Sequence, residues 1–183
     1  VYAADVDGDG DMDVLSASHD DDKIALYENV GSHGFNNSVF VSHDISTSAI
    51  GAFDVHAADV DGDGDMDVLS ASSEEDKIAW YENNGSESFT DHVISTSADY
   101  AYSVYAADVG GDGDMDVLSA SLEDDKIAWY ENDGSEGFTE HAISTSADLA
   151  YSVHAEDVDG DGDMDVLSAS YYGDDKIVWY END

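Results

Sequence analysis

An acidic segment, Asp-Val-Asp-Gly-Asp-Gly-Asp-Met-Asp, occurs four times in this chain, and three copies are identical. The copies begin at Asp5, Asp59, Asp108 and Asp157. Five carboxylates within nine residues repel one another unless a cation lies among them. The segment therefore predicts an ion-binding loop, and its recurrence predicts a fold built from repeats.

The repeats have a nearly constant length. Val1, Val55, Val104 and Val153 are equivalent, at spacings of 54, 49 and 49 residues, and the first repeat carries five extra residues between Gly31 and His43. A period of about fifty residues is typical of propeller blades, whereas a helical solenoid would show a 3.6-residue pattern that is missing here. We treat 1–183 as a single repeat domain, with units 1–54, 55–103, 104–152 and a truncated 153–183.

Each complete repeat contains four short strand-like segments. In the third repeat they are 103–109, 115–121, 125–132 and 138–144, separated by Glu/Asp-rich and Asn-Asp-Gly-Ser turns. Four antiparallel strands at a fixed period make one propeller blade. We therefore expect an all-β, propeller-type array of four blades with four-stranded antiparallel sheets. The tryptophans in the third strands, or Leu26 in the first repeat, should fill the space between blades.

The last repeat ends after its third strand-like segment, at 179–183. We expect the fourth blade to be incomplete and to present an open edge. Either the sequence is part of a longer array, or another copy of the chain covers this edge. The sequence leaves ring closure open.

The spacing of the acidic segment suits a hard cation. In the second copy Asp59, Asp61 and Asp63 occupy positions one, three and five, and Gly64 permits a sharp turn. Asp65, at position seven, would offer its backbone carbonyl, and Asp67, at position nine, would close the shell. Oxygen donors alone favour Ca²⁺ over Zn²⁺, and so many protein oxygens disfavour the strongly hydrated Mg²⁺.

Two other interpretations of the segment fit the sequence less well. An EF-hand requires Glu at position twelve and helical flanks, but this position is Ser in every copy and the flanks are strand-like. Solvated acidic turns would explain one such segment, but they do not explain four with the same glycines and the same final Asp.

The loop, the following Val-Leu-Ser-Ala-Ser strand and the Lys-Ile-x-Trp-Tyr-Glu-Asn segment together resemble the FG-GAP/VCBS repeat family, which includes integrin α-subunit propellers. The resemblance covers the whole chain. It implies an extracellular Ca²⁺-binding β-propeller with about one ion per blade, held between the first two strands. The implied ligands are Asp5, Asp7, Asp9, Asp11, Asp13, Asp59, Asp61, Asp63, Asp65, Asp67, Asp108, Asp112, Asp114, Asp116, Asp157, Asp159, Asp161, Asp163 and Asp165.

The sequence departs from the family pattern in two ways. Gly110 replaces the expected Asp in the third loop, so this site should bind Ca²⁺ more weakly. Complete family propellers often have seven blades, and this chain has four.

Charge restricts the partners. The chain has 45 Asp and Glu residues, four Lys and no Arg, and a formal net charge of −41. It therefore cannot neutralise a phosphate backbone, so nucleic acid is excluded as a partner, and membrane insertion is not expected. Bound divalent ions would offset part of this charge, and loops of this type fill in Ca²⁺-rich extracellular fluid. Asn36 and Asn84 lie in glycosylation sequons, and their use is left open.

The positions of the repeated histidines and lysines indicate structural roles for these residues. His43, His92 and His141 are equivalent and fall on three different blades, which favours packing over metal binding. His56 and His154 alternate with Tyr residues, and each of the four lysines follows an acidic turn, where local charge pairing is expected.

We expect an extracellular, calcium-stabilised scaffold for adhesion or self-assembly, not an enzyme. Its partners would be other copies of the chain or flanking repeats, bound through the open edge of the last blade. The alternative is a carbohydrate-binding, lectin-like module with glycans as partners. A third possibility is part of a polysaccharide-degrading enzyme; paired carboxylates are abundant, but the absence of Arg counts against anionic substrates.

Overall fold

The computed structural model describes residues 1–31, 39–86, 88–171 and 175–182. These residues form fifteen β-strands. None of the described segments is a helix that could cross a membrane. The extra residues of the first repeat, which include Asn36, lie mostly outside the described ranges.

The strands form four antiparallel sheets in chain order. The first three sheets have four strands each: β1 (Tyr2–Ala4), β2 (Asp13–Ser18), β3 (Lys23–Asn29), β4 (Phe40–Ser46); β5 (Ala52–Ala58), β6 (Asp67–Ser72), β7 (Lys77–Asn83), β8 (Phe89–Ser95); β9 (Ala101–Ala107), β10 (Asp116–Ser121), β11 (Lys126–Asn132), β12 (Phe138–Ser144). The fourth sheet has three: β13 (Ala150–Glu156), β14 (Asp165–Ser170), β15 (Ile177–Tyr180). The predicted all-β array of four blades, with an incomplete last blade, is confirmed.

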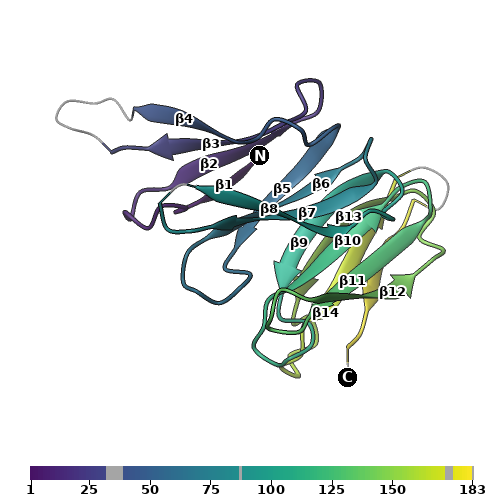
Figure 1. Ribbon diagram of the computed structural model, residues 1–183. Coiled ribbons are helices and arrows are strands. Elements are labelled where there is room, and N and C mark those ends of the chain that lie inside the picture. The colour runs from purple at the N-terminus through teal and green to yellow at the C-terminus, as the bar shows by residue number, and fades with distance from the viewer. Residues whose placement is uncertain (32–38, 87, 172–174, 183) are drawn as a thin grey trace.

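The sheets stack face to face in an open row and do not close into a ring. Figure 1 shows β1–β4 at one end of this row, and the last sheet lies beyond β9–β12 at the other. The first strands of consecutive sheets, β5, β9 and β13, lie beside one another. Each sheet therefore contributes one face to the interface before it and the other face to the interface after it.

Apolar residues on both faces of the sheets fill these interfaces. Leu26 packs in one cluster with Val68 and Tyr81 of the next sheet. Trp80 packs in the equivalent cluster with Val117 and Tyr130. The second strands are buried along their whole length in the two central sheets, which is why the small Val-Leu-Ser-Ala-Ser residues recur there.

The tryptophans of the third strands fill the space between blades, as predicted, and the burial of each one depends on the blade that follows it. Trp80 is fully buried, Trp129 is partly buried, and Trp179 of the last blade is 44% exposed. The same residue type is thus buried or exposed according to whether a complete blade follows it.

A column of rings runs along the first strands. Ring centroids of Tyr2 and His56 are 4.5 Å apart, those of His56 and Tyr105 are 4.6 Å apart, and those of Tyr105 and His154 are 4.3 Å apart. These contacts confirm the shape-filling role predicted for the alternating His and Tyr residues. Burial, together with the charge of His154, lowers the pKa of His56 to about 4.

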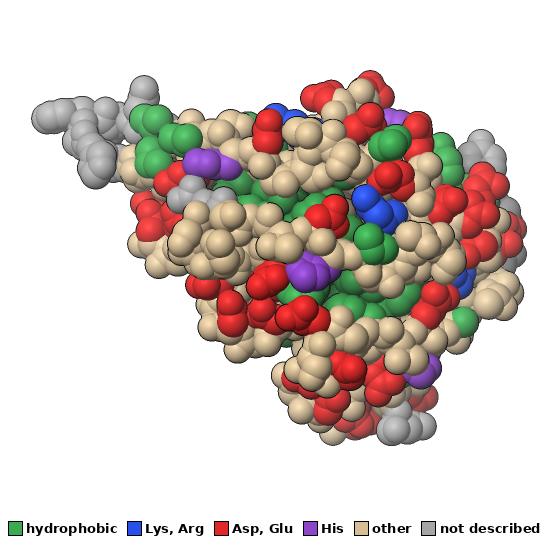
Figure 2. All heavy atoms as spheres, viewed as in Figure 1, with side chains coloured by type: hydrophobic (Ala, Val, Ile, Leu, Met, Phe, Trp, Pro, Cys, Tyr) green, Lys and Arg blue, Asp and Glu red, His purple; other side chains and the backbone are tan. Residues whose placement is uncertain are grey.

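The lysines pair locally, as predicted. Lys23 Nζ lies 2.5 Å from Asp44, and Lys77 Nζ lies 2.8 Å from Glu75. Lys126 Nζ contacts Asp124 at 3.2 Å and Glu140 at 3.0 Å. Figure 2 shows few basic side chains among the many acidic ones on the visible face.

Candidate metal centres

The acidic segments connect the first and second strands of each blade. In the second loop Gly62 and Gly64 have φ angles of 76° and 101°, in the left-handed region that glycine adopts at little cost. The backbone N–H groups of Gly62 and Gly64 donate to the two carboxylate oxygens of Asp59, at 2.9 and 3.1 Å. The loop therefore folds back over its first carboxylate, as the glycine spacing predicts.

Three of the four loops bring carboxylates together. In each, one oxygen from position one, one from position three and one from position nine lie within 4.8 Å of one another. The three clusters are Asp5, Asp7 and Asp13; Asp59, Asp61 and Asp67; and Asp157, Asp159 and Asp165. Three converging carboxylates repel one another, so each cluster is a place where a cation would lower the energy of the fold.

The aspartate at position nine has a second role that the sequence did not reveal. Asp67 is fully buried, and its two oxygens accept the backbone N–H groups of Val60 at 2.9 Å and Asn83 at 2.7 Å. These bonds fasten the loop to the end of β7. Burial raises the pKa of Asp67 to about 6 despite the two hydrogen bonds, so its ionised form is costly without a cation nearby.

Asp165, the equivalent residue in the last blade, behaves differently. The backbone N–H of Asn182 donates to Asp165 Oδ1 at 2.9 Å, and this bond is the main cause that lowers the pKa of Asp165. Burial raises the pKa of Asp61 and of Asp7, which lie at position three of their loops. The free energy needed to keep these carboxylates ionised therefore differs from loop to loop.

Positions five and seven lie outside these clusters. Asp63 Oδ1 accepts the backbone N–H of Asp65 at 2.9 Å, and the same bond recurs from Asp11 to Asp9 at 2.8 Å. The remaining pairs are Asp112 with Asp114 and Asp161 with Asp163. The position-five side chains are exposed, and the position-seven side chains are exposed or half-buried. Their part in ligation, through a side chain or a backbone carbonyl, stays a prediction.

The third loop, all of which the structure describes, forms no cluster of this kind. Gly110 removes the position-three carboxylate, and its backbone N–H donates instead to Asp116 Oδ2 at 2.9 Å. Asp108 accepts the N–H groups of Asp112 and Gly113. The loop thus keeps its shape but has lost one of the three converging groups, in line with the predicted weaker site.

An asparagine clamp, formed by Asn83, Asn132 and Asn182, ties the loops of the second, third and fourth blades to the blade before each of them. Asn132 is buried, and its side-chain nitrogen donates to the carbonyl oxygens of Val60 at 3.0 Å and Met115 at 3.1 Å. Asn83 makes the equivalent bonds to Val6 and Met66. The sequence places these asparagines at the end of a predicted strand and gives no sign of this bonding role. Their recurrence at the end of the Trp-Tyr-Glu-Asn segment was the available signal.

The equivalent histidines sit on separate sheets, as predicted. His92 Nε2 lies 2.9 Å from Glu82 Oε2, and the His92 ring stacks on Trp80 at 4.5 Å. His141 repeats both contacts, with Glu131 and Trp129. Asn84 is exposed, and its Oδ1 accepts the N–H of Ser86 at 3.1 Å.

The donors in the three clusters are all oxygens, and each set includes one fully buried Asp. No His or Cys takes part among the described residues. Hard, oxygen-preferring divalent cations fit such a donor set, and backbone carbonyls of the same loop are available to complete a shell. The first, second and fourth blades each contain one such candidate centre.

Comparisons with known proteins agree with this architecture. A family model described as FG-GAP-like repeat matches residues 5–70, 59–119 and 111–168. Among solved structures, the chain is similar to an Agrocybe aegerita lectin described as specifically recognising non-reducing terminal N-acetylglucosamine, with a TM-score of 0.62 and 16% identity. The match covers 92% of this chain and 46% of the lectin chain, so this chain spans about half the lectin's length. A search of curated proteins found no match.

Proposed function

This chain belongs to the FG-GAP-like repeat family, and we propose that it is an extracellular, calcium-stabilised repeat scaffold that acts in adhesion or self-assembly without catalysis. The observation that carries this proposal is the convergence of three carboxylates in three of the four loops, each with a fully buried Asp. A cation there would offset repulsion in a chain with a net charge of −41.

Calcium fits the loops best among the common divalent ions. The donors are carboxylates and backbone carbonyls on a flexible, glycine-containing turn, which suits the six to eight ligands of Ca²⁺ better than the strict octahedron of Mg²⁺. Extracellular modules bind Ca²⁺ at roughly 10⁻⁴–10⁻³ M, which supports an extracellular location for loops that are mostly solvent-exposed.

The calcium proposal is tested by thermal unfolding with Ca²⁺ and with EGTA. At a free Ca²⁺ concentration about 100 times Kd, each site adds about 2.7 kcal/mol to the free energy of unfolding. Three such sites would raise the melting temperature by roughly 20 °C for a domain of this size. An unchanged melting curve in EGTA would refute the structural role of calcium.

The open row of sheets supports the scaffold role. Among the described residues, both ends of the row present faces of the kind that the inner blades bury, and β15 has no fourth-strand neighbour of the kind present in the other sheets. Partners would be other copies of this chain or flanking repeats. A mass above that of the monomer in sedimentation at micromolar concentration, with Ca²⁺ present, would support self-assembly, and a strict monomer would count against it.

A second candidate function is carbohydrate binding. Phe53, Tyr102 and Tyr151 form a row of rings, with centroids 3.9 Å and 5.0 Å apart. With Asp54 and Ser103 they line an open hollow of about 190 Å³. Aromatic rings beside a carboxylate and a hydroxyl are suited to sugars, and the similar lectin recognises N-acetylglucosamine. Saturable binding on a glycan array that Tyr102→Ala abolishes would favour this alternative.

A further inference from the structure

The aspartate at position nine of each loop accepts two backbone N–H groups in the same way. In the first loop, Val6 donates to Asp13 Oδ2 at 2.9 Å and Asn29 donates to Asp13 Oδ1 at 2.7 Å. The equivalent pair of bonds is present in the other three loops. One donor is always the residue at position two of the loop, and the other is the asparagine at or just after the end of the third strand.

The asparagine clamp connects these bonds from one blade to the next. Val6, whose N–H binds Asp13, accepts at its carbonyl a bond from Asn83 Nδ2 at 3.2 Å. The backbone N–H of Asn83 in turn donates to Asp67 Oδ1 at 2.7 Å. The position-nine carboxylates of the first and second loops are therefore connected through two residues, and we call the set Asp13, Val6, Asn83 and Asp67 the first loop bridge.

A second loop bridge repeats this arrangement at the next interface. The N–H of Val60 donates to Asp67 Oδ2 at 2.9 Å, and the carbonyl of Val60 accepts a bond from Asn132 Nδ2 at 3.0 Å. The N–H of Asn132 donates to Asp116 Oδ1 at 2.8 Å. Asp67 therefore belongs to both bridges, with one oxygen bonded toward the first loop and the other toward the third.

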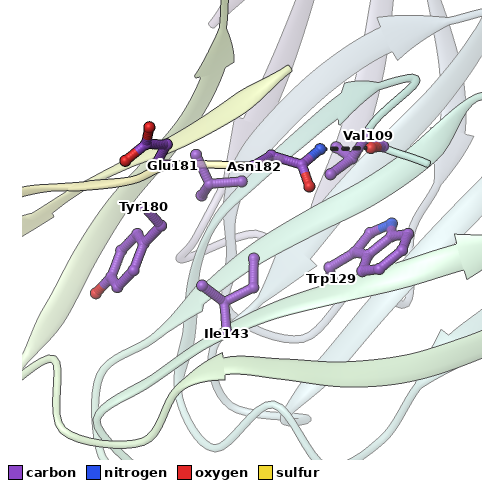
Figure 3. A pocket seen from close by; sticks show the side chains of 7 residues that line it. Val109, Trp129, Ile143, Tyr180, Glu181 and Asn182 are labelled. Atoms are coloured by element: carbon purple, nitrogen blue, oxygen red, sulfur yellow. Dashed lines mark hydrogen bonds between the residues drawn. The ribbon is translucent and has the colours of Figure 1, made fainter. Parts of the chain in front are cut away.

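A third loop bridge connects the third loop to the fourth. Figure 3 shows its central bond, from the Asn182 side chain to the Val109 carbonyl, which is 3.0 Å long. Both residues line a cavity of about 110 Å³, together with Trp129. Asn182 is half-buried, whereas Asn83 and Asn132 are buried. The first two bridges are therefore better shielded from water than the third.

Such a bridge transmits order from one loop to the next. When Asp13 is fixed in the shell of a cation, Val6 is fixed with it, because its N–H is bonded to the same carboxylate. The Val6 carbonyl then holds the side chain of Asn83, and the backbone of Asn83 orients Asp67. Ordering of the first loop thus pre-organises a ligand of the second and reduces the entropy that is lost when the second loop binds.

We propose that the loop bridges make calcium binding by neighbouring loops positively cooperative, and that Asn83 couples the first site to the second. Among the described loops, the first and second are the neighbouring pair in which both hold three converging carboxylates. The coupling is reciprocal, so each of these two sites strengthens the other. This inference deepens the proposed function and rests on the calcium sites proposed there.

The test is a Ca²⁺ titration of the full chain followed by ¹H–¹⁵N NMR. The N–H of Gly10 donates to Asp5 at 3.0 Å, and the N–H of Gly64 donates to Asp59 at 3.1 Å. The amide resonances of these two glycines therefore report the first and second sites separately. Asp7→Asn weakens the first site by removing one of its three converging carboxylates, and it leaves every residue of the first loop bridge unchanged.

We expect the second site to bind Ca²⁺ about fivefold more weakly in Asp7→Asn than in the unmodified chain. Electrostatics alone predicts the opposite sign. The substitution removes one negative charge, but the ion lost from the first loop removes two positive charges, so the first loop becomes more negative and attracts a cation to the second. The fourth site, reported by the amide of Gly160, which donates to Asp157 at 2.7 Å, should change clearly less.

Asn83→Ala tests the bridge itself. It removes the side chain that reaches Val6 but keeps the backbone N–H that binds Asp67. In this background Asp7→Asn should no longer weaken the second site, which completes a double-mutant cycle. The matched control is Asn29→Ala at the same position of the first blade, which should leave the coupling unchanged, because the Asn29 side chain donates to Met12 of its own blade.

Two results would overturn the proposal: a second site that is equally strong or stronger in Asp7→Asn, or a coupling that persists in Asn83→Ala. If Asn83→Ala does not fold, the comparison of the second and fourth sites in Asp7→Asn still decides the matter, since equal weakening of both would contradict the bridge. Failure of the proposed function gives a different result, because Ca²⁺ would then shift neither glycine resonance. Independent binding at both sites would keep the calcium scaffold and remove only the coupling.

Discussion

Removal of the asparagine clamp should reduce stability more in a blade that follows another blade than in the first described blade. Asn132 is 3% exposed and bonds across the interface to Val60 and within its own blade to Met115. Its own Oδ1 accepts the N–H of Gly134 at 3.1 Å. The perturbation is Asn132→Ala, which removes all three bonds without adding bulk.

The expected cost follows from what these bonds satisfy. Each net hydrogen bond contributes about 1 kcal/mol, and a buried carbonyl left without a donor costs about 1–3 kcal/mol. Val60 is 3% exposed, so water has little access to its carbonyl once the amide is gone. We expect Asn132→Ala to lower the free energy of unfolding by about 3 kcal/mol.

The chain contains its own matched control. Asn29 occupies the same position in the first blade, which has no blade before it among the described residues, and its side-chain nitrogen donates to the Met12 carbonyl at 3.3 Å. Met12 is 55% exposed, so water can replace the lost donor. We expect Asn29→Ala to cost less than about 1 kcal/mol.

Urea unfolding at pH 7 with Ca²⁺, followed by tryptophan fluorescence, measures both variants. A difference of about 2 kcal/mol between them supports the clamp as the inter-blade tie. Equal losses of stability in Asn132→Ala and Asn29→Ala would refute the reasoning, because Asn132 makes a bond to the preceding blade and accepts a bond from Gly134, and Asn29 makes neither among the described residues.

Two further predictions concern the packed rings. The pKa of His56 is lowered to about 4, mainly by burial, so between pH 7 and pH 5 the unfolded chain takes up a proton that the folded chain does not. Stability should therefore fall by about 2 kcal/mol over this range, and His56→Tyr, which matches Tyr105 at the equivalent position, should remove that loss in parallel urea titrations; an unchanged pH slope would contradict it. Trp80→Leu, which places at this position the residue type of Leu26, should lower the free energy of unfolding by about 2 kcal/mol. Trp129→Leu should lower it clearly less, because Trp129 already borders a cavity. Equal losses of stability in the same assay would show that the cavity does not loosen that interface.

Much of the fold was predictable because the same residue pattern occurs in every repeat. The strand at 126–132 agrees with its predicted range of 125–132, and the strand at 138–144 matches exactly in both bounds. The first strand of the third blade spans Ala101–Ala107, two residues earlier than expected at each end, since its pairing with β10 continues past the hydrophobic run to Ala101. The missing fourth strand of the last blade was equally readable from the repeat.

The parts that the sequence did not predict depend on contacts between blades. The position-nine aspartate was assigned to the metal shell, and its hydrogen bonds to Val60 and Asn83 in the second blade emerge only once the strands are paired. The partner of Asn132, Val60, lies 72 residues away, a distance that no local pattern records. The open ring is likewise a property of how the sheets stack.

A calorimetric Ca²⁺ titration of the chain and of Gly110→Asp shows whether calcium occupies the converging carboxylates. A Cβ at Gly110 would lie 3.5 Å from Asp116 Oδ2 and 3.6 Å from Trp129, which are ordinary contacts, so the loop can accept the side chain. We expect three ions to bind with similar affinity and a fourth to bind more weakly, and we expect Gly110→Asp to raise the affinity of the fourth site to that of the others. Absence of calcium binding, or an identical titration for Gly110→Asp, would contradict it.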